Sequence, residues 1–113
     1  MYYYANKDSE LFIDLARIYW NITLKDSGLI NYIAQETLTP VIILYGSLSK
    51  AEVKPNSDID VAIFTVTKKE LNIEQYEKKL KRKIQLMIFN DIGSPSKELL
   101  NNILNGYKLE GSW

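Results

Sequence analysis

A short apolar run between a proline and a glycine constrains the fold of this chain most strongly. Val41–Tyr45 is continuous and rich in β-branched residues, with Pro40 before it and Gly46 after it, which predicts a strand buried on both faces. A second run, Asp58–Val66, begins with alternating acidic and apolar residues and predicts another strand. The polar stretch between the runs is too long for a tight hairpin. The two runs therefore predict the centre of a sheet with a long connecting loop.

Apolar residues at helical spacing precede these strands. The segment Ser9–Leu24 predicts a helix that lies on the core, with Asp8 or Ser9 as its N-cap. The segment Ser27–Leu38 predicts a short second helix, which ends before Pro40 because the residue preceding a proline avoids the helical region. Residues 1–38 are therefore expected to form an N-terminal pair of helices.

A third helix is expected after the second strand. Thr67 and Glu70 have the spacing of a capping box, and the helix they would begin runs to about Arg82. Asn72 with Gln75 is an alternative start for the same helix. The sequence predicts the helix and leaves both starts open.

The C-terminal part predicts a strand, a helix and a tail. Ile84–Phe89 is a third apolar run, and Ser94 as N-cap with Pro95 at the first helical position predicts a last helix that ends near Gly106. Tyr107–Trp113 is a tail or a short edge strand. The element order indicates an α/β (α+β) fold with a mixed sheet of three to four strands and helices packed mainly on one face.

The bulk composition excludes several classes of protein. With 113 residues, of which 46% are apolar and 25% charged, the chain is expected to be a single domain over 1–113, with its core in 39–111. Fourteen basic and fourteen acidic residues cancel, so nucleic acid is not the expected partner. The chain has no cysteine and no histidine, which leaves carboxylates, hydroxyls, lysine and arginine for any chemistry. No stretch approaches the roughly 20 apolar residues of a membrane span and no signal peptide is recognisable, so a cytoplasmic location is expected.

The residues between the first two strands suggest a phosphate and metal site. Gly46 lets the backbone approach a phosphate closely, and Ser47 offers a hydroxyl and an N–H. Ten residues separate Ser47 from Asp58, and Asp58 and Asp60 project from the same face of a strand because they are two residues apart. This arrangement suits a nucleoside triphosphate with Mg²⁺.

The segment from Gly46 to Asp60 resembles the signature of the DNA polymerase β nucleotidyltransferase superfamily, and more narrowly that of the minimal nucleotidyltransferases. Lys50 stands where the family usually has arginine, and Ala51 where it usually has glycine. The resemblance covers the three predicted strands and extends toward the last helix. The positions that match the family pattern are Gly46, Ser47, Glu52, Pro55, Ser57, Asp58 and Asp60.

The resemblance implies transfer of a nucleoside monophosphate, AMP in the first instance, from a triphosphate to a hydroxyl acceptor. Asp58 and Asp60 would hold Mg²⁺ or Mn²⁺ as the catalytic pair, while Gly46, Ser47 and Lys50 would contact ATP or another triphosphate. Ser57 either contacts the nucleotide or supports the turn before the aspartates. Minimal members often act as antitoxins beside a helical partner of the HEPN type, so such a partner, whose tyrosine is a candidate acceptor, is implied here.

One departure from the family bears on activity. The third acidic residue of active members falls on Gln85, which is neutral and cannot serve as a base or a charged metal ligand. Asp91 has the same strand parity and is a weaker candidate for that role. The alternative function is therefore a weak or inactive nucleotide-binding module that works by binding its partner.

Two further features have open interpretations. Five cations between Lys78 and Lys83 either stabilise a helix C-terminus or contact an acidic partner or nucleic acid. Trp20 and Trp113 are expected as partly exposed anchors, which would favour a homo-oligomer or a protein partner.

Overall fold

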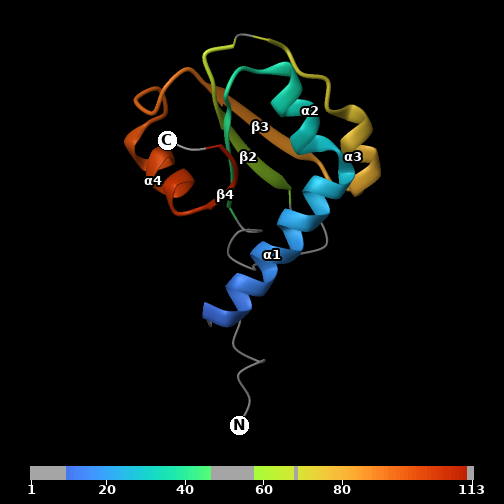
Figure 1. Cartoon of the computed structure of the whole chain (residues 1–113). Helices are drawn as coiled ribbons and strands as arrows, with labels where there is room; N and C mark the ends of the chain where they lie inside the picture. Colours follow the sequence, from blue (N-terminus) through green and yellow to red (C-terminus); the bar gives the residue numbers. More distant parts are fainter. Residues whose placement is uncertain (1–9, 47–57, 68, 112–113) are drawn as a thin grey trace.

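The computed structural model describes residues 10–46, 58–67 and 69–111. Within them the chain forms four helices and four strands (Figure 1). In chain order these are α1 (Glu10–Ser27), α2 (Leu29–Glu36), β1 (Val41–Tyr45), β2 (Ile59–Phe64), α3 (Glu74–Leu80), β3 (Ile84–Phe89), α4 (Lys97–Leu104) and β4 (Tyr107–Glu110). The described part contains no helix with the length and apolar character needed to cross a membrane.

The four strands form one mixed sheet in the order β3-β2-β1-β4. β1 is antiparallel to both β2 and β4, whereas β2 and β3 are parallel and are connected through α3. The C-terminal tail therefore supplies an edge strand. This architecture confirms the predicted fold class and its four-stranded alternative.

Alternating residues of the two central strands pack on opposite faces of the sheet. Ile42 and Leu44 of β1 belong to a core cluster with residues of α1 and α2, while Val41 and Ile43 pack with Ile103 of α4. Figure 1 shows α1, α2 and α3 on one side of the sheet and α4 on the other. Three of the four described helices thus share one face, as the sequence predicted.

The start of α3 differs from the first of its two predicted positions. Thr67 does not cap a helix, because its Oγ1 accepts a hydrogen bond from the Leu38 N–H at 2.8 Å, and α3 begins only at Glu74. The Glu74 N–H instead donates to Asn72 Oδ1 at 3.2 Å. The alternative start at Asn72 is therefore the better one, because a long-range contact holds Thr67 in the preceding loop.

Two other local predictions need correction. Ser96, not Ser94, caps α4, since Ser96 Oγ accepts the Leu99 N–H at 3.2 Å. Trp20 is only 6% exposed and belongs to the core, so it is not the exposed anchor that the sequence suggested; its ring packs edge-on against Tyr19 with centroids 5.2 Å apart. Trp113 lies outside the described residues.

Candidate functional site

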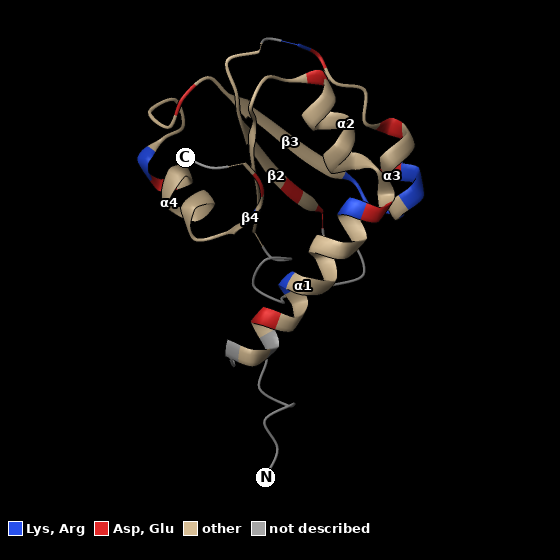
Figure 2. Cartoon of the chain, viewed as in Figure 1, with Lys and Arg blue, Asp and Glu red and all other residues tan. Residues whose placement is uncertain are grey.

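The sheet topology gathers the candidate residues at one end of the sheet. Gly46 directly follows β1, Asp58 directly precedes β2, and Gln85 is the second residue of β3. Because β1 is antiparallel to β2 and β2 is parallel to β3, the end of β1 lies beside the starts of the other two strands. In this register Asp60 pairs with Tyr45 on one side and with Gln85 on the other. Figure 2 shows the acidic start of β2 in red.

Gly46 makes the closest approach to the acidic pair. Its φ of 77° lies in the left-handed region that favours glycine. A Cβ atom added at Gly46 would collide with Asp60 Oδ2 and lie 3.2 Å from Asp60 Cγ. The glycine after β1 is therefore required by the position of the Asp60 carboxylate as well as by the backbone turn.

Gln85 lies at the acidic pair. The family resemblance places the third acidic residue of active members at this position. Its Nε2 donates a hydrogen bond of 2.8 Å to Asp58 Oδ2, and its backbone pairs with Asp60 in the sheet. The side chain is exposed, so it borders solvent as well as the carboxylates. A neutral amide thus holds Asp58 where an acid would add a third negative charge.

The electrostatics of the site favour a bound cation. Burial raises the pKa of the Asp60 carboxyl, and the neighbouring Asp58 carboxylate raises it further. Burial also raises the pKa of the Tyr45 hydroxyl, with a smaller contribution from Asp60. A divalent cation between the two carboxylates would offset both effects on Asp60, because it stabilises the ionised form.

The Asp60 shift predicts a pH-dependent effect on stability. Because its folded-state pKa is raised, ionised Asp60 destabilises the fold at neutral pH, and this penalty disappears as pH falls below the ordinary range of an aspartic acid. We expect Asp60→Asn to raise the urea midpoint at about pH 7 and to leave it nearly unchanged at about pH 3. Equal shifts at both pH values would contradict the assignment. Asp91→Asn serves as the matched control.

Asp91 is not brought to the acidic pair. It follows the far end of β3, in a turn where its Oδ1 accepts the Gly93 N–H at 2.8 Å and the Ser94 hydroxyl at 3.3 Å. A strand advances by about 3.3 Å per residue, so the length of β3 separates Asp91 from Gln85. Asp91 has the same strand parity as Gln85, but parity places two residues on one face only within a strand. β3 ends at Phe89, and the following turn carries Asp91 away from the acidic pair. Among the other predicted contacts, Ser47, Lys50 and Ser57 lie outside the described residues.

The described donor set is compatible with Mg²⁺. No group of three or more histidine, cysteine, aspartate or glutamate residues in the described part is placed to hold a metal ion. Mg²⁺ is commonly held by one or two carboxylates together with substrate phosphates and water. Asp58 and Asp60 supply that number of carboxylates, so the two aspartates fit the ion when a triphosphate completes its coordination.

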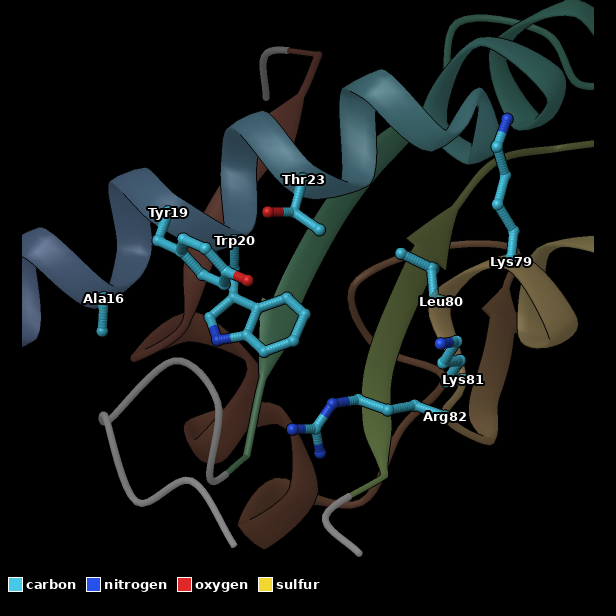
Figure 3. A pocket seen from close by; sticks show the side chains of 8 residues that line it. All are labelled: Ala16, Tyr19, Trp20, Thr23, Lys79, Leu80, Lys81 and Arg82. Atoms are coloured by element: carbon cyan, nitrogen blue, oxygen red, sulfur yellow. The ribbon is translucent and has the colours of Figure 1, made fainter. Parts of the chain in front are cut away.

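The basic cluster at the C-terminal end of α3 has structural contacts with α1. Arg82 Cζ lies 5.2 Å from the centroid of the Trp20 ring, and Lys79 Nζ donates to the Ser27 carbonyl at 3.1 Å. Both belong to a hollow of about 520 Å³ between α1 and the end of α3 (Figure 3). These contacts favour the structural interpretation of Lys79 and Arg82, since each ties α3 to α1.

Tyr45 is a site residue that sequence reasoning missed. Its pairing with Asp60 follows from the register of β1 against β2. The only local signal was its position directly before Gly46, at the end of an apolar run. That position is equally typical of a core aromatic residue, so the antiparallel register was needed to place it.

Comparison with known proteins agrees with this geometry. Residues 27–109 match the family described as Polymerase beta, Nucleotidyltransferase. A solved structure, described as the crystal structure of a toxin-antitoxin with AMP-PNP, is similar with a TM-score of 0.62 and 24% identity, over 79% of this chain and 75% of that chain. No curated protein matches the chain. The family match spans most of the sequence and includes Gly46, Asp58, Asp60 and Gln85, and the chain therefore belongs to the polymerase β nucleotidyltransferase family.

Proposed function

We propose that this protein binds a nucleoside triphosphate together with Mg²⁺ or Mn²⁺ at the end of the sheet where β1, β2 and β3 meet. The observation that carries the proposal is the contact of Gly46 with the Asp60 carboxylate, next to Asp58. Burial and, to a smaller extent, the neighbouring Asp58 carboxylate raise the pKa of Asp60, and a bound cation would stabilise its ionised form. A triphosphate and its metal supply both the charge and the remaining ligands.

Each residue has a distinct part in this proposal. Asp58 and Asp60 would hold the metal, whose chemistry there would be to neutralise charge that develops at the transferred phosphorus. Gly46 leaves room at the end of β1 and keeps the backbone against Asp60. Ser47 and Lys50 are proposed to bind the phosphates, and Ser57 to support the turn or contact the nucleotide.

Gln85 bears on whether the protein transfers a nucleotidyl group or only binds the nucleotide. Its amide cannot accept a proton from an attacking hydroxyl, and it already donates to Asp58. We therefore favour a nucleotide-binding component of a toxin-antitoxin pair with weak or absent transfer. The second candidate, Mg²⁺-dependent transfer of AMP to a hydroxyl on a HEPN-type helical toxin, is favoured by the retained pair Asp58 and Asp60.

The similar solved structure supports the proposed ligand and setting. It is a toxin-antitoxin determined with AMP-PNP, so ATP is the first nucleotide to test here, and a protein partner is the first acceptor to test. At 24% identity the similarity shows that the two proteins share a fold, and experiments must identify the substrate and the partner of this protein.

Titration calorimetry with ATP tests the binding proposal. We expect the wild type to bind ATP only when Mg²⁺ or Mn²⁺ is present, and Asp58→Asn or Asp60→Asn to weaken binding at least about tenfold, because each removes a charged metal ligand. Asp91→Asn, which changes the same residue type at the other end of β3, should bind like the wild type. Metal-independent binding, or full binding by Asp60→Asn, would sink the proposal.

A further inference from the structure

Helix α1 is apolar on two opposite sides, and the described residues cover only one of them. Trp20 and Leu24 are buried in the core, and Arg17 Nη2 donates to the Asn105 carbonyl at 3.0 Å, so these residues fasten one side of α1 to the rest of the molecule. An amphipathic surface helix normally carries polar residues on its other side. Here that side carries leucine and isoleucine.

The uncovered side has the spacing of a helix-packing seam. Four residues at successive intervals of four, three and four form this apolar stripe, namely Leu11, Leu15, Ile18 and Ile22. They are 65%, 57%, 51% and 55% exposed, and Tyr19 beside them is 60% exposed. This alternation keeps all four on one side of a helix and matches the positions that interlock when two helices pack side by side.

The stripe also lies outside the residues that match the family model. The family match begins at residue 27, and α1 ends at Ser27. Figure 1 shows the N-terminal half of α1 projecting beyond the sheet. A helix with an uncovered apolar stripe on a projecting segment is suited to association with another helix.

We propose that the apolar stripe of α1 packs against the same stripe of a second copy of this chain, with the two helices antiparallel. In a twofold arrangement centred between Leu15 and Ile18, Leu15 of each helix faces Ile18 of the other, and Leu11 faces Ile22. All four stripe residues then find a partner. The proposal stands independently of nucleotide binding.

Charge and shape favour the antiparallel orientation. Asp14 and Lys25 flank the stripe on the same side, in the N-terminal half and in the last turn of α1, so antiparallel packing moves Lys25 of one helix toward Asp14 of the other, whereas parallel packing would set like charges side by side. The dipoles of the two helices also oppose each other in this orientation. The two sheets would lie toward opposite ends of the helix pair, because each sheet packs on the C-terminal half of its own α1 (Figure 1).

Sedimentation velocity tests the association. Four side chains per helix form a small interface, so we expect a wild-type dimer with a micromolar Kd. Leu15→Glu and Ile18→Glu should each give a monomer with an unchanged circular dichroism spectrum, since both positions are exposed in the single chain. Leu104 is an apolar residue of α4 that is 49% exposed, and the control variant Leu104→Glu should remain dimeric.

Cysteine crosslinking tests the orientation without background, because the chain has no cysteine. A mixture of the Leu11→Cys and Ile22→Cys variants with a short bis-maleimide should give mainly the mixed dimer, because two Leu11 positions lie about 16 Å apart along the axis of antiparallel helices, whereas parallel helices would crosslink each variant to itself. A monomeric wild type at millimolar concentration, a dimer that survives Leu15→Glu, or crosslinking of Leu11→Cys to itself alone would overturn the proposal. So would a monomeric wild type whose stripe is needed to bind a different protein.

Discussion

Gln85→Asp is expected to raise nucleotidyl transfer at least about 100-fold over the wild type, because a positioned general base typically contributes 10²–10⁴-fold. Gln85 already contacts Asp58 and pairs with Asp60, so the new carboxylate would enter an existing group of acids. The measurement is label transfer from α-labelled ATP, with Mg²⁺ and a HEPN-type helical toxin as acceptor.

Two controls make this result specific. Gln85→Asn keeps a neutral amide of the same length as aspartate and should leave transfer at the wild-type rate. Gln85→Asp combined with Asp58→Asn should lose the gain, because the new acid acts with the existing pair. If Gln85→Asp binds Mg²⁺ and ATP but transfers no faster than Gln85→Asn, a missing carboxylate is not what limits this protein.

Magnesium binding provides a readout that needs no acceptor. A third carboxylate beside Asp58 and Asp60 adds charge repulsion in the metal-free state and adds a ligand in the bound state. Gln85→Asp should therefore have a lower melting temperature than Gln85→Asn without divalent cation and a larger rise on adding Mg²⁺. A rise equal to that of Gln85→Asn would contradict the proximity of the three side chains.

Gly46→Ala is expected to destabilise the fold by about 2 kcal/mol and to abolish metal-dependent ATP binding. An alanine at a φ of 77° costs about 1–2 kcal/mol, and its Cβ would collide with Asp60 Oδ2. Relief of that collision must turn the Asp60 carboxylate away from its present position. Urea unfolding measures the first effect and titration calorimetry the second.

A double-mutant cycle separates the two origins of this loss. In an Asp60→Ala background the colliding atoms are absent, and Gly46→Ala should then cost only the backbone contribution. Asp60→Ala lacks the carboxylate, so the cycle is read on stability alone. Additive effects of the two changes would show that Gly46 and Asp60 do not interact.

Local chemistry explains which elements could be predicted. Val41–Tyr45 and Ile84–Phe89 are apolar runs bounded by breaks in the pattern, and both are strands with the predicted bounds. The start of α3 was harder, because Thr67 and Asn72 both have capping chemistry. A hydrogen bond from the Leu38 N–H, far away in the sequence, holds Thr67 in the preceding loop, and α3 begins just after Asn72, whose Oδ1 accepts the Glu74 N–H.

Tertiary packing, and not local sequence, also decided the positions of Trp20 and Asp91. Trp20 has helical spacing with other apolar residues, and the sequence does not show which side of α1 meets the core. Packing placed Trp20 inside, under Arg82, and left Leu15 and Ile18 outside. Asp91 shared the parity of Gln85, but parity has no meaning once the strand has ended.

The sequence by itself determined the strands, the glycine after β1 and the paired aspartates, because each depends on residues close together in the chain. Only the tertiary structure decided that Tyr45, Asp60 and Gln85 lie side by side and that the Gln85 amide binds Asp58. The physical reason is that strand register depends on hydrogen bonds between distant segments and on the helices that cover the sheet. The sequence alone shows that residue 85 is glutamine and not an acid. It does not show that this side chain contacts the aspartate pair.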